Sequence, residues 1–229
     1  MHQSLVSKAF NLPYLQKTRY RWVDYIKGIA ILLVVYRHVL IGIERSGIEV
    51  SEYMNDANMI FYSFRMPLFF ILSGIFIASS LAKRSFRQLA ALKFELLIYP
   101  YFVWVFLQIT FQILLSHYTN SNRSWIDYTY IFYQPRNLDQ FWYLPALFNV
   151  TIVYALLKYK LQVKIEYQLL LGLILYYVSM WAREISILSD WMDFYIFFAI
   201  GDAFSNILFK PHTQIKLKGN AVLIITIPL

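Results

Sequence analysis

Cysteine is absent from this chain of 229 residues. Its absence excludes disulfide bonds, metal sites built on thiolates and a thioester formed on the enzyme itself. Charge is scarce as well, because Asp, Glu, Lys and Arg together make up 15% of the residues, against roughly 25% in ordinary soluble domains. The chain also has no internal repeat and no low-complexity tract. These absences argue against an ordinary soluble domain.

Hydrophobic and aromatic residues are abundant instead. They account for 59% and 19% of the chain, and the mean hydropathy is +0.49. This composition is typical of a membrane protein. The formal net charge of +8 does not indicate nucleic-acid binding, because the basic residues lie in short loops between apolar runs rather than on one patch.

The long apolar runs predict membrane-spanning helices, since a helix needs ~20 mainly apolar residues to cross the hydrocarbon core. We expect spans at 23–43, 59–82, 94–116, 141–157, 165–182 and 191–209, and the start of a seventh near Ala221. The predicted fold is therefore all-α, a polytopic transmembrane helical bundle with about six complete spans and a partial seventh. No small-residue cleavage site follows the first apolar run, so we do not expect a cleavable signal peptide.

Charges between the runs alternate in sign from one loop to the next. Cations dominate the tail and every second loop, with Lys83, Arg84, Arg87, Lys93, Lys158, Lys160, Lys164, Lys210, Lys216 and Lys218 in those loops. Carboxylates dominate the other loops, with Glu44, Glu49, Glu52, Asp56, Asp127, Asp139, Glu184, Asp190 and Asp193. Because Lys and Arg concentrate on the cytoplasmic side, we expect the amino terminus to be cytoplasmic.

The last apolar run is short. The sequence ends at Leu229, about nine residues into that run, which is too few to cross a bilayer. Either the protein continues beyond Leu229 or this segment is not a true span, and we favour the first interpretation. We therefore expect a cytoplasmic tail at residues 1–22 and a transmembrane domain at 23–229 that is incomplete at its carboxyl end.

The first span contains four ionisable residues, at positions 24, 27, 37 and 38. Ionisable groups at membrane depth are costly and tend to mark functional sites. At ~100° per residue, Lys27 and His38 lie three turns apart on the same face of the helix. Asp24 lies near that face, whereas Arg37 points to another side. His38 lies ~22 Å along the helix from Val23, in the outer half of the membrane.

Four stretches, in this order, resemble landmarks of the acyltransferase 3 family, which are bacterial inner-membrane O-acyltransferases of surface glycans. They are Arg21–His38, Phe64–Gly74, Tyr99–Tyr101 and Phe141–Phe148. Lys27 takes the place that is more often arginine in the family, and His38 matches the family's histidine. The resemblance covers about 21–210, and the nearest subgroup is that of the fucose 4-O-acetyltransferase-like proteins.

This resemblance implies an enzyme that moves an acyl group, which is expected to be acetyl, from acyl-coenzyme A to a hydroxyl of a cell-surface glycan or its lipid-linked precursor. It also implies a multi-pass protein of the bacterial inner membrane that uses acetyl-coenzyme A as a substrate and binds no cofactor. Its expected partners are thus the acyl donor, the glycan acceptor and the lipid bilayer, and not nucleic acid.

Acyl transfer needs a base for the hydroxyl proton and stabilisation of the developing oxyanion. His38 is the only histidine inside a predicted span, so it is the candidate base, with Lys27 and Asp24 as further catalytic candidates. The alternative is that His38 only forms hydrogen bonds to neighbouring helices. No pair of His or acidic residues within a span has metal-ligand spacing, so we predict no metal site.

A cluster of cations on the predicted inner side is the candidate donor site. Arg84 and Arg87 lie one helical turn apart near Lys93 and could bind the phosphates of coenzyme A, because guanidinium binds phosphate bidentately. The alternative is the general excess of cations on that side of the membrane, with attraction to anionic lipid.

On the predicted outer side, Arg37 and Arg65 are candidates for holding an anionic acceptor or an oxyanion. Arg65 could instead extend to the membrane interface. Trp142 and Tyr143 could stack on a sugar ring of the acceptor or belong to the aromatic belt of the interface.

Two other classes of function stay open. A transporter would also explain a buried polar face, but the paired Gly- or Pro-broken spans expected in related halves of such proteins are not found in this sequence. An inactive family member would explain the missing carboxyl-terminal spans.

Overall fold

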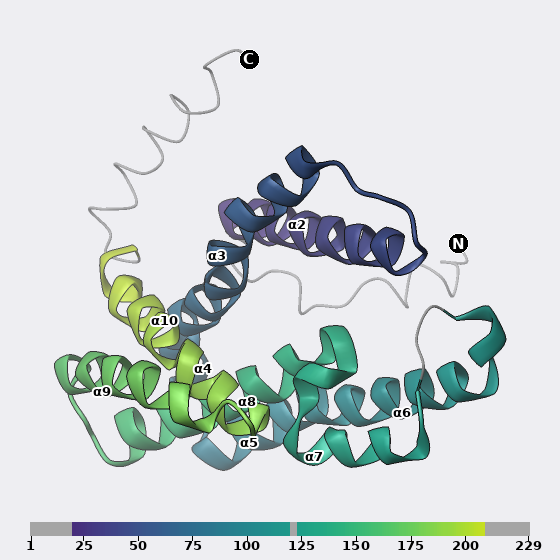
Figure 1. The fold of residues 1–229 in the computed structure, drawn as a ribbon. Helices are drawn as coiled ribbons and strands as arrows, with labels where there is room; N and C mark the ends of the chain where they lie inside the picture. Colours follow the sequence, from purple (N-terminus) through teal and green to yellow (C-terminus); the bar gives the residue numbers. More distant parts are fainter. Residues whose placement is uncertain (1–19, 120–122, 209–229) are drawn as a thin grey trace, which may run out of the picture.

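The computed structural model describes residues 20–119 and 123–208, and this part of the chain is helical with short connections (Figure 1). The predicted all-α class is therefore confirmed. The first half consists of α2 (Arg21–Arg45), α3 (Glu52–Ile75), α4 (Ile77–Leu81), α5 (Phe86–Lys93), the π-helical turn η2 (Phe94–Ile98), α6 (Tyr99–Leu114) and η3 (Ser116–Tyr118). The second half consists of η4 (Trp125–Thr129), α7 (Tyr130–Tyr133), η5 (Pro135–Trp142), α8 (Tyr143–Ala155), η6 (Leu156–Lys160), α9 (Ile165–Val178), η7 (Ser179–Ala182) and α10 (Ser186–Leu208).

Within these residues, five helical stretches are long and apolar enough to cross a membrane. They are Trp22–Arg45, Glu52–Leu81, Phe86–Leu114, Pro135–Lys160 and Ile165–Ala182. Each overlaps one of the first five predicted spans over most of its length, and the second and third predicted spans extend one and two residues too far. The sixth predicted span forms α10, which is not among the five. Asp190, Asp193 and Asp202 lie in α10 and lower its hydropathy. The seventh predicted span and the tail before residue 20 lie outside the described residues.

Helices α3 and α10 pack side by side with their backbones in close contact. A Cβ atom on Gly74 would collide with the carbonyl oxygen of Phe198, and one on Gly201 would collide with the carbonyl oxygen of Ile71. Small residues permit such close approach, and in a membrane this packing supplies stability that the hydrophobic effect cannot. These two glycines therefore fix how α3 and α10 cross.

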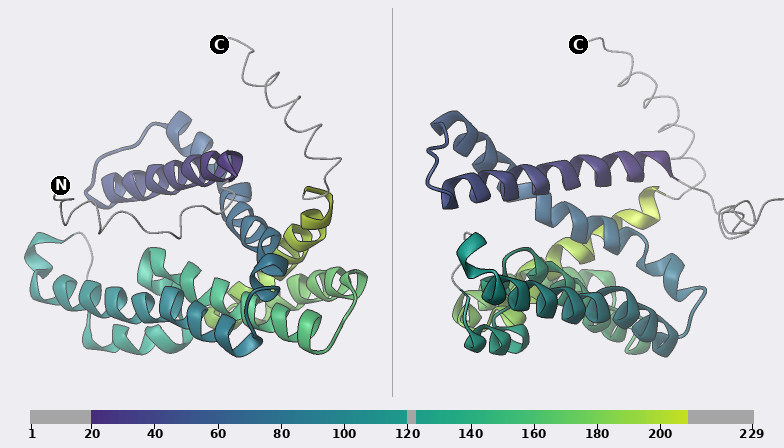
Figure 2. Two further views of the ribbon diagram at one scale, coloured as in Figure 1. Left: turned by 180° about the vertical axis from the view of Figure 1, so that it is seen from behind. Right: turned by 90° about the vertical axis from the view of Figure 1, so that its right-hand side faces the viewer.

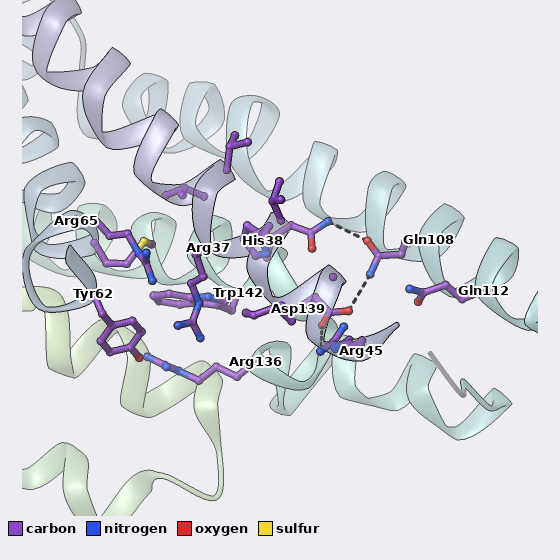
Figure 3. A pocket seen from close by; sticks show the side chains of 17 residues that line it. Arg37, His38, Arg45, Tyr62, Arg65, Gln108, Gln112, Arg136, Asp139 and Trp142 are labelled. Carbon is purple, nitrogen blue, oxygen red and sulfur yellow. Dashed lines mark hydrogen bonds and ion pairs between the residues drawn. The ribbon is translucent and has the colours of Figure 1, made fainter. Parts of the chain in front are cut away.

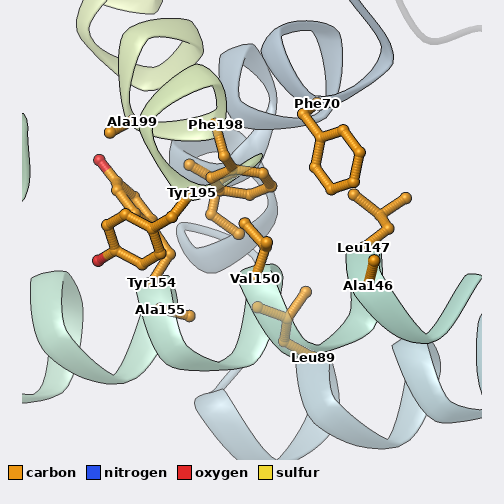
Figure 4. Close-up of a cluster of buried hydrophobic side chains, with 11 residues drawn as sticks. Phe70, Leu89, Ala146, Leu147, Val150, Tyr154, Ala155, Tyr195, Phe198 and Ala199 are labelled. Carbon is orange, nitrogen blue, oxygen red and sulfur yellow. The ribbon is translucent and has the colours of Figure 1, made fainter. Parts of the chain in front are cut away.

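The main core lies where α3, α5, α8 and α10 meet (Figure 4). Phe70 of α3 stacks on Phe194 of α10 with ring centroids 4.4 Å apart. Tyr154 of α8 is fully buried and donates a hydrogen bond to Asp202 of α10 at 2.6 Å, and Lys158 pairs with the same carboxylate. A buried carboxylate is tolerated because these partners satisfy it.

The segment between α6 and α8 folds back over the bundle. Ile131 and Leu138 are buried there against Tyr101, Val105 and Ile109 of α6. The hydroxyl of Tyr101 donates a hydrogen bond to the backbone carbonyl of Ile131 at 2.7 Å. These contacts hold η5, which contains Leu138, in place beside α6.

Helix α2 lies apart from this core, and Figures 1 and 2 show it across the molecule from α6 and α8. It packs on α3, mainly through Val23 against Leu72 and Ile75 near its amino end. Only 11% of the most apolar 18-residue stretch of α2 is buried within the described structure. The carboxyl-terminal half of α2 is consequently left facing α6 and η5 across an open space that the site occupies.

Candidate functional site

A cavity of about 790 Å³ lies between α2, α3, α6 and η5 (Figure 3). Its polar and aromatic lining residues are Arg37, His38, Arg45, Tyr62, Arg65, Gln108, Gln112, Arg136, Asp139, Gln140 and Trp142. Each wall comes from a different element, so the cavity depends on the fold and not on one sequence motif. It is rich in guanidinium groups and has one imidazole.

His38 lies on the α2 wall of the cavity. Its side chain is exposed, and Figure 3 shows it facing the region between α2 and the residues of η5. It is neither sealed in a dry helix contact nor packed in the core. A ligand that enters the cavity can therefore reach the imidazole.

Arg65 on α3 is almost fully buried, with 1% of its surface exposed. Its Nη1 donates hydrogen bonds to the carbonyl oxygen of Leu33 at 3.3 Å and to Oδ1 of Asn58 at 3.1 Å. Its buried Nη2 finds no partner among the described residues. Leaving a buried donor unpaired costs ~1–3 kcal/mol, and more when the group is charged.

Arg37 and Arg65 share one aromatic neighbour. The Cζ atoms of the two guanidinium groups lie 4.9 Å and 5.3 Å from the ring centroid of Tyr62. Cation–π contacts of this kind are worth ~0.5–2 kcal/mol. The ring therefore holds both cations at one end of the cavity.

Arg136 and Trp142 line the cavity from η5. The Arg136 guanidinium lies 4.4 Å from the Trp142 ring centroid and forms an ion pair with Asp190 of α10. Figure 3 shows the Trp142 ring flat against the cavity beside Arg37. The ion pair fixes the arginine, and the arginine in turn fixes the indole.

Asp139 connects three elements at the edge of the cavity. Its carboxylate accepts hydrogen bonds from Arg45 of α2 at 3.0 Å, from Arg123 at 2.7 Å and from Gln108 of α6 at 3.4 Å. Its backbone has a positive φ of 61°, a conformation that costs most residues energy but that Asp tolerates better than most. The three bonds to its side chain support this strained turn.

The sequence matches the family model for the acyltransferase domain of acyltransferase 3 over residues 20–227. The chain belongs to this family. It is thus a membrane-bound acyltransferase, a transferase of acyl groups other than aminoacyl groups. Comparisons with curated proteins and with solved structures give no match.

The acyltransferase brings four of the predicted site residues into one cavity: Arg37, His38, Arg65 and Trp142. Arg37 lies on the cavity wall together with His38, although the two point to different sides of α2. Tyr143, which follows Trp142, does not line this cavity. Its ring packs on Phe70 of the core, with centroids 5.3 Å apart.

The remaining predicted residues lie toward the other end of α2. Asp24 and Lys27 are exposed and do not line the cavity. Lys27 and Arg84 both lie close enough to Lys93 for their charges to act on it. Lys27 therefore belongs with the predicted donor cluster rather than with His38, although the two share a helix face.

The sequence did not point to a site role for seven polar residues of the cavity, which are Arg45, Tyr62, Gln108, Gln112, Arg136, Asp139 and Gln140. The sequence did contain a signal for the α6 wall of the cavity. Gln108 and Gln112 are two carboxamides one helical turn apart that interrupt an apolar run. The described part of the acyltransferase has no cluster of three or more His, Asp or Glu residues suited to a metal ion.

Proposed function

We propose that this acyltransferase moves an acetyl group from acetyl-coenzyme A to a hydroxyl of a cell-surface glycan or of its lipid-linked precursor, in the inner membrane of a bacterium. The observation that carries the proposal is the position of His38, which is exposed in a polar cavity of a protein whose family performs acyl transfer. A base exposed to a ligand and surrounded by hydrogen-bond donors is what the reaction requires.

In the proposed reaction, the His38 imidazole accepts the proton of the acceptor hydroxyl as its oxygen attacks the carbonyl carbon of the thioester. A carbon–oxygen bond forms and the carbonyl electrons move onto its oxygen. When the carbonyl re-forms, the carbon–sulfur bond breaks and the thiolate of coenzyme A leaves. The thiolate takes the proton from His38, so that the products are an ester and a thiol and the imidazole is neutral again.

The oxyanion that forms on the way needs donors that are already in place. The walls around His38 offer guanidinium groups and the carboxamides of Gln108 and Gln140. These two carboxamides are joined by a hydrogen bond of 3.0 Å, and Gln108 also contacts Asp139. Such fixed donors can stabilise charge without reorganising during the reaction.

The donor is proposed to enter from the cytoplasmic end, where Lys27, Arg84, Arg87 and Lys93 supply positive charge for its phosphates. Arg84 and Arg87 flank the start of α5, which Ser85 caps with a hydrogen bond from the backbone of Gln88 at 3.3 Å. Lys27 lies ~16 Å from His38 along α2 at ~1.5 Å per residue. The pantetheine arm would cover this distance and bring the thioester to the cavity.

The acceptor is proposed to enter the cavity from the outer side, where the Trp142 ring is available for stacking on a sugar. Trp142 is half-buried and held by Arg136. Its contribution is better supported than that of Tyr143, whose ring is part of the core packing.

Transfer of radiolabelled acetyl groups from acetyl-coenzyme A to membrane glycans tests this function. Membranes that contain the full chain should label the glycan fraction, and His38→Ala should lower the rate by ~100-fold or more, as expected for loss of a general base. His117→Ala is the matched control, because that histidine is exposed at the end of α6 and does not line the cavity. Retained transfer by His38→Ala would remove the base role, and absence of labelling with the wild-type chain would refute the function.

A further inference from the structure

Positive charge in the cavity is only partly neutralised. Arg45 pairs with Asp139 at 3.0 Å, and Arg136 pairs with Asp190. Arg37 and Arg65 have no carboxylate within ion-pair distance among residues 20–119 and 123–208. Two guanidinium charges thus face the same cavity without an anion from this part of the chain.

The geometry of Arg65 indicates where such an anion would bind. Its Nη1 is held by Leu33 and Asn58, so that the orientation of the guanidinium plane is fixed. Its Nη2 is buried and has no hydrogen-bond partner in the described structure, and the Arg65 side chain is among those that line the cavity. A buried polar group without a partner in a native protein requires an explanation, and a ligand is one.

Arg37 completes a pair of donors around the Tyr62 ring. The aromatic ring attracts both cations through its face. It does not accept hydrogen bonds from the N–H groups, which point outward in the plane of each guanidinium. These N–H groups match the oxygen atoms of a carboxylate or a phosphate, which guanidinium binds bidentately. Figure 3 shows Arg37 extending from α2 between Tyr62 and the Trp142 ring.

We propose that Arg37 and Arg65 bind an anionic group of the acceptor, a phosphate or a carboxylate attached to the sugar, and so select acidic acceptors. This inference rests on the proposed function and adds the class of acceptor. Arg37, Arg65 and His38 line the same cavity, so an anion bound by the two arginines keeps the rest of the acceptor in the cavity that the imidazole lines. The arginine pair is then a substrate anchor, and His38 remains the base.

A binding experiment without any acyl donor tests the anchor separately from the reaction. The purified full chain in detergent is heated with inorganic phosphate or with acetate, each at constant ionic strength maintained by chloride. Phosphate, acetate or both should raise the unfolding temperature of the wild type. The response should weaken about tenfold in apparent affinity in Arg37→Gln and in Arg65→Gln, since each loses a charge-assisted hydrogen bond.

Arg183→Gln is the matched control, because it removes one outer guanidinium that does not line this cavity. It should respond like the wild type. Arg37 is only half-buried, so its variant keeps the test valid if Arg65→Gln does not fold. Stronger stabilisation by phosphate points to a sugar phosphate, and stronger stabilisation by acetate points to a uronic acid. No stabilisation by either anion, or the same loss in Arg183→Gln, would overturn the proposal.

Kinetics distinguish an acceptor anchor from two other roles of the same residues. Inorganic phosphate should inhibit transfer in competition with the acceptor, and Arg37→Gln should raise the acceptor KM about tenfold with kcat changed less than about twofold. Competition with acetyl-coenzyme A would assign the pair to the donor instead. An equal loss in kcat and kcat/KM would assign it to the oxyanion, and either result contradicts an acceptor anchor.

Discussion

The middle and the carboxyl-terminal part of α3 have opposite environments. Toward its carboxyl end, Phe70 and Gly74 pack against α10 without space between the helices. Toward its middle, Tyr62 is exposed and Arg65 forms the wall of an open cavity. One helix therefore belongs both to the closely packed core and to the cavity.

This difference explains how the site is positioned. The core around α3, α8 and α10 fixes one wall of the cavity, and η5 is held by the buried contacts of α6. Helix α2 provides the other wall. Its apolar packing on α3 lies near its own amino end, and farther along it contacts α3 through the Leu33 carbonyl and Arg37. The proposed base His38 thus lies where the packing leaves a cavity, and the closely packed helix α3 keeps Arg65 in place.

The largest effect on stability is expected when the buried ion pair of the core is broken. Asp202→Ala leaves the Lys158 ammonium without its partner and removes the acceptor of Tyr154. Loss of one member of a buried pair costs ~3–5 kcal/mol. Denaturant unfolding in detergent measures the loss. The double variant Asp202→Leu with Lys158→Met should recover most of it, and a single variant as stable as wild type would show that this pair does not hold the core.

A smaller effect is expected at the crossing of α3 and α10. Gly201→Ala places a methyl group against the carbonyl of Ile71, and forcing extra atoms into tight packing costs ~1–3 kcal/mol. The unfolding temperature of the purified protein should fall. Gly28→Ala is the control, because a Cβ there meets no atom within 4 Å, and its unfolding temperature should not fall. Equal behaviour of the two variants would contradict the close crossing.

At the edge of the cavity, the same kind of charge removal should matter less for stability. Asp139→Asn keeps a side chain that tolerates positive φ but removes the counter-charge of Arg45 and Arg123. Partly exposed ion pairs contribute ~0–1 kcal/mol, so the free energy of unfolding should change by about 1 kcal/mol or less. A loss of unfolding free energy as large as that of Asp202→Ala would mean that the ion pairs of Asp139 stabilise the fold as much as the buried ion pair of the core does.

The smallest effect is expected at the amino-terminal end of α2, where the donor is proposed to bind. Lys27→Met removes one exposed cation and should raise the KM for acetyl-coenzyme A a few-fold without changing the unfolding temperature, because an exposed charge near a phosphate contributes modestly. Steady-state transfer at varied donor concentration measures this change. A fall in kcat of the size predicted for His38→Ala would place Lys27 in catalysis instead.

Much of the fold followed from the sequence because apolar runs and the length of a span are strong constraints. Helices long and apolar enough to cross a membrane were confirmed at the first five predicted spans. His38 and Arg65 were recognised because ionisable groups within apolar runs are conspicuous. Arg136 and Asp139 were not recognised, since they lie in irregular turns whose shape depends on contacts with α6 and α10. Periodicity also grouped Lys27 with His38, but a shared face over ~16 Å is not a shared cavity.

The most direct test of the account is the accessibility of position 38 from outside the cell. Because the chain has no cysteine, His38→Cys introduces a single thiol that a membrane-impermeant thiol reagent can report. We predict that it reacts in intact cells and that Leu40→Cys, at a side chain only 3% exposed, does not, while Trp125→Cys in the outer segment reacts freely. In inside-out vesicles that enclose the thiol reagent, the reagent meets the outer face and added acetyl-coenzyme A meets the cytoplasmic face. Acetyl-coenzyme A should then slow the modification of the thiol at position 38. A thiol at position 38 that stays unreactive while Trp125→Cys is labelled would contradict an imidazole exposed in a cavity open to the outer side.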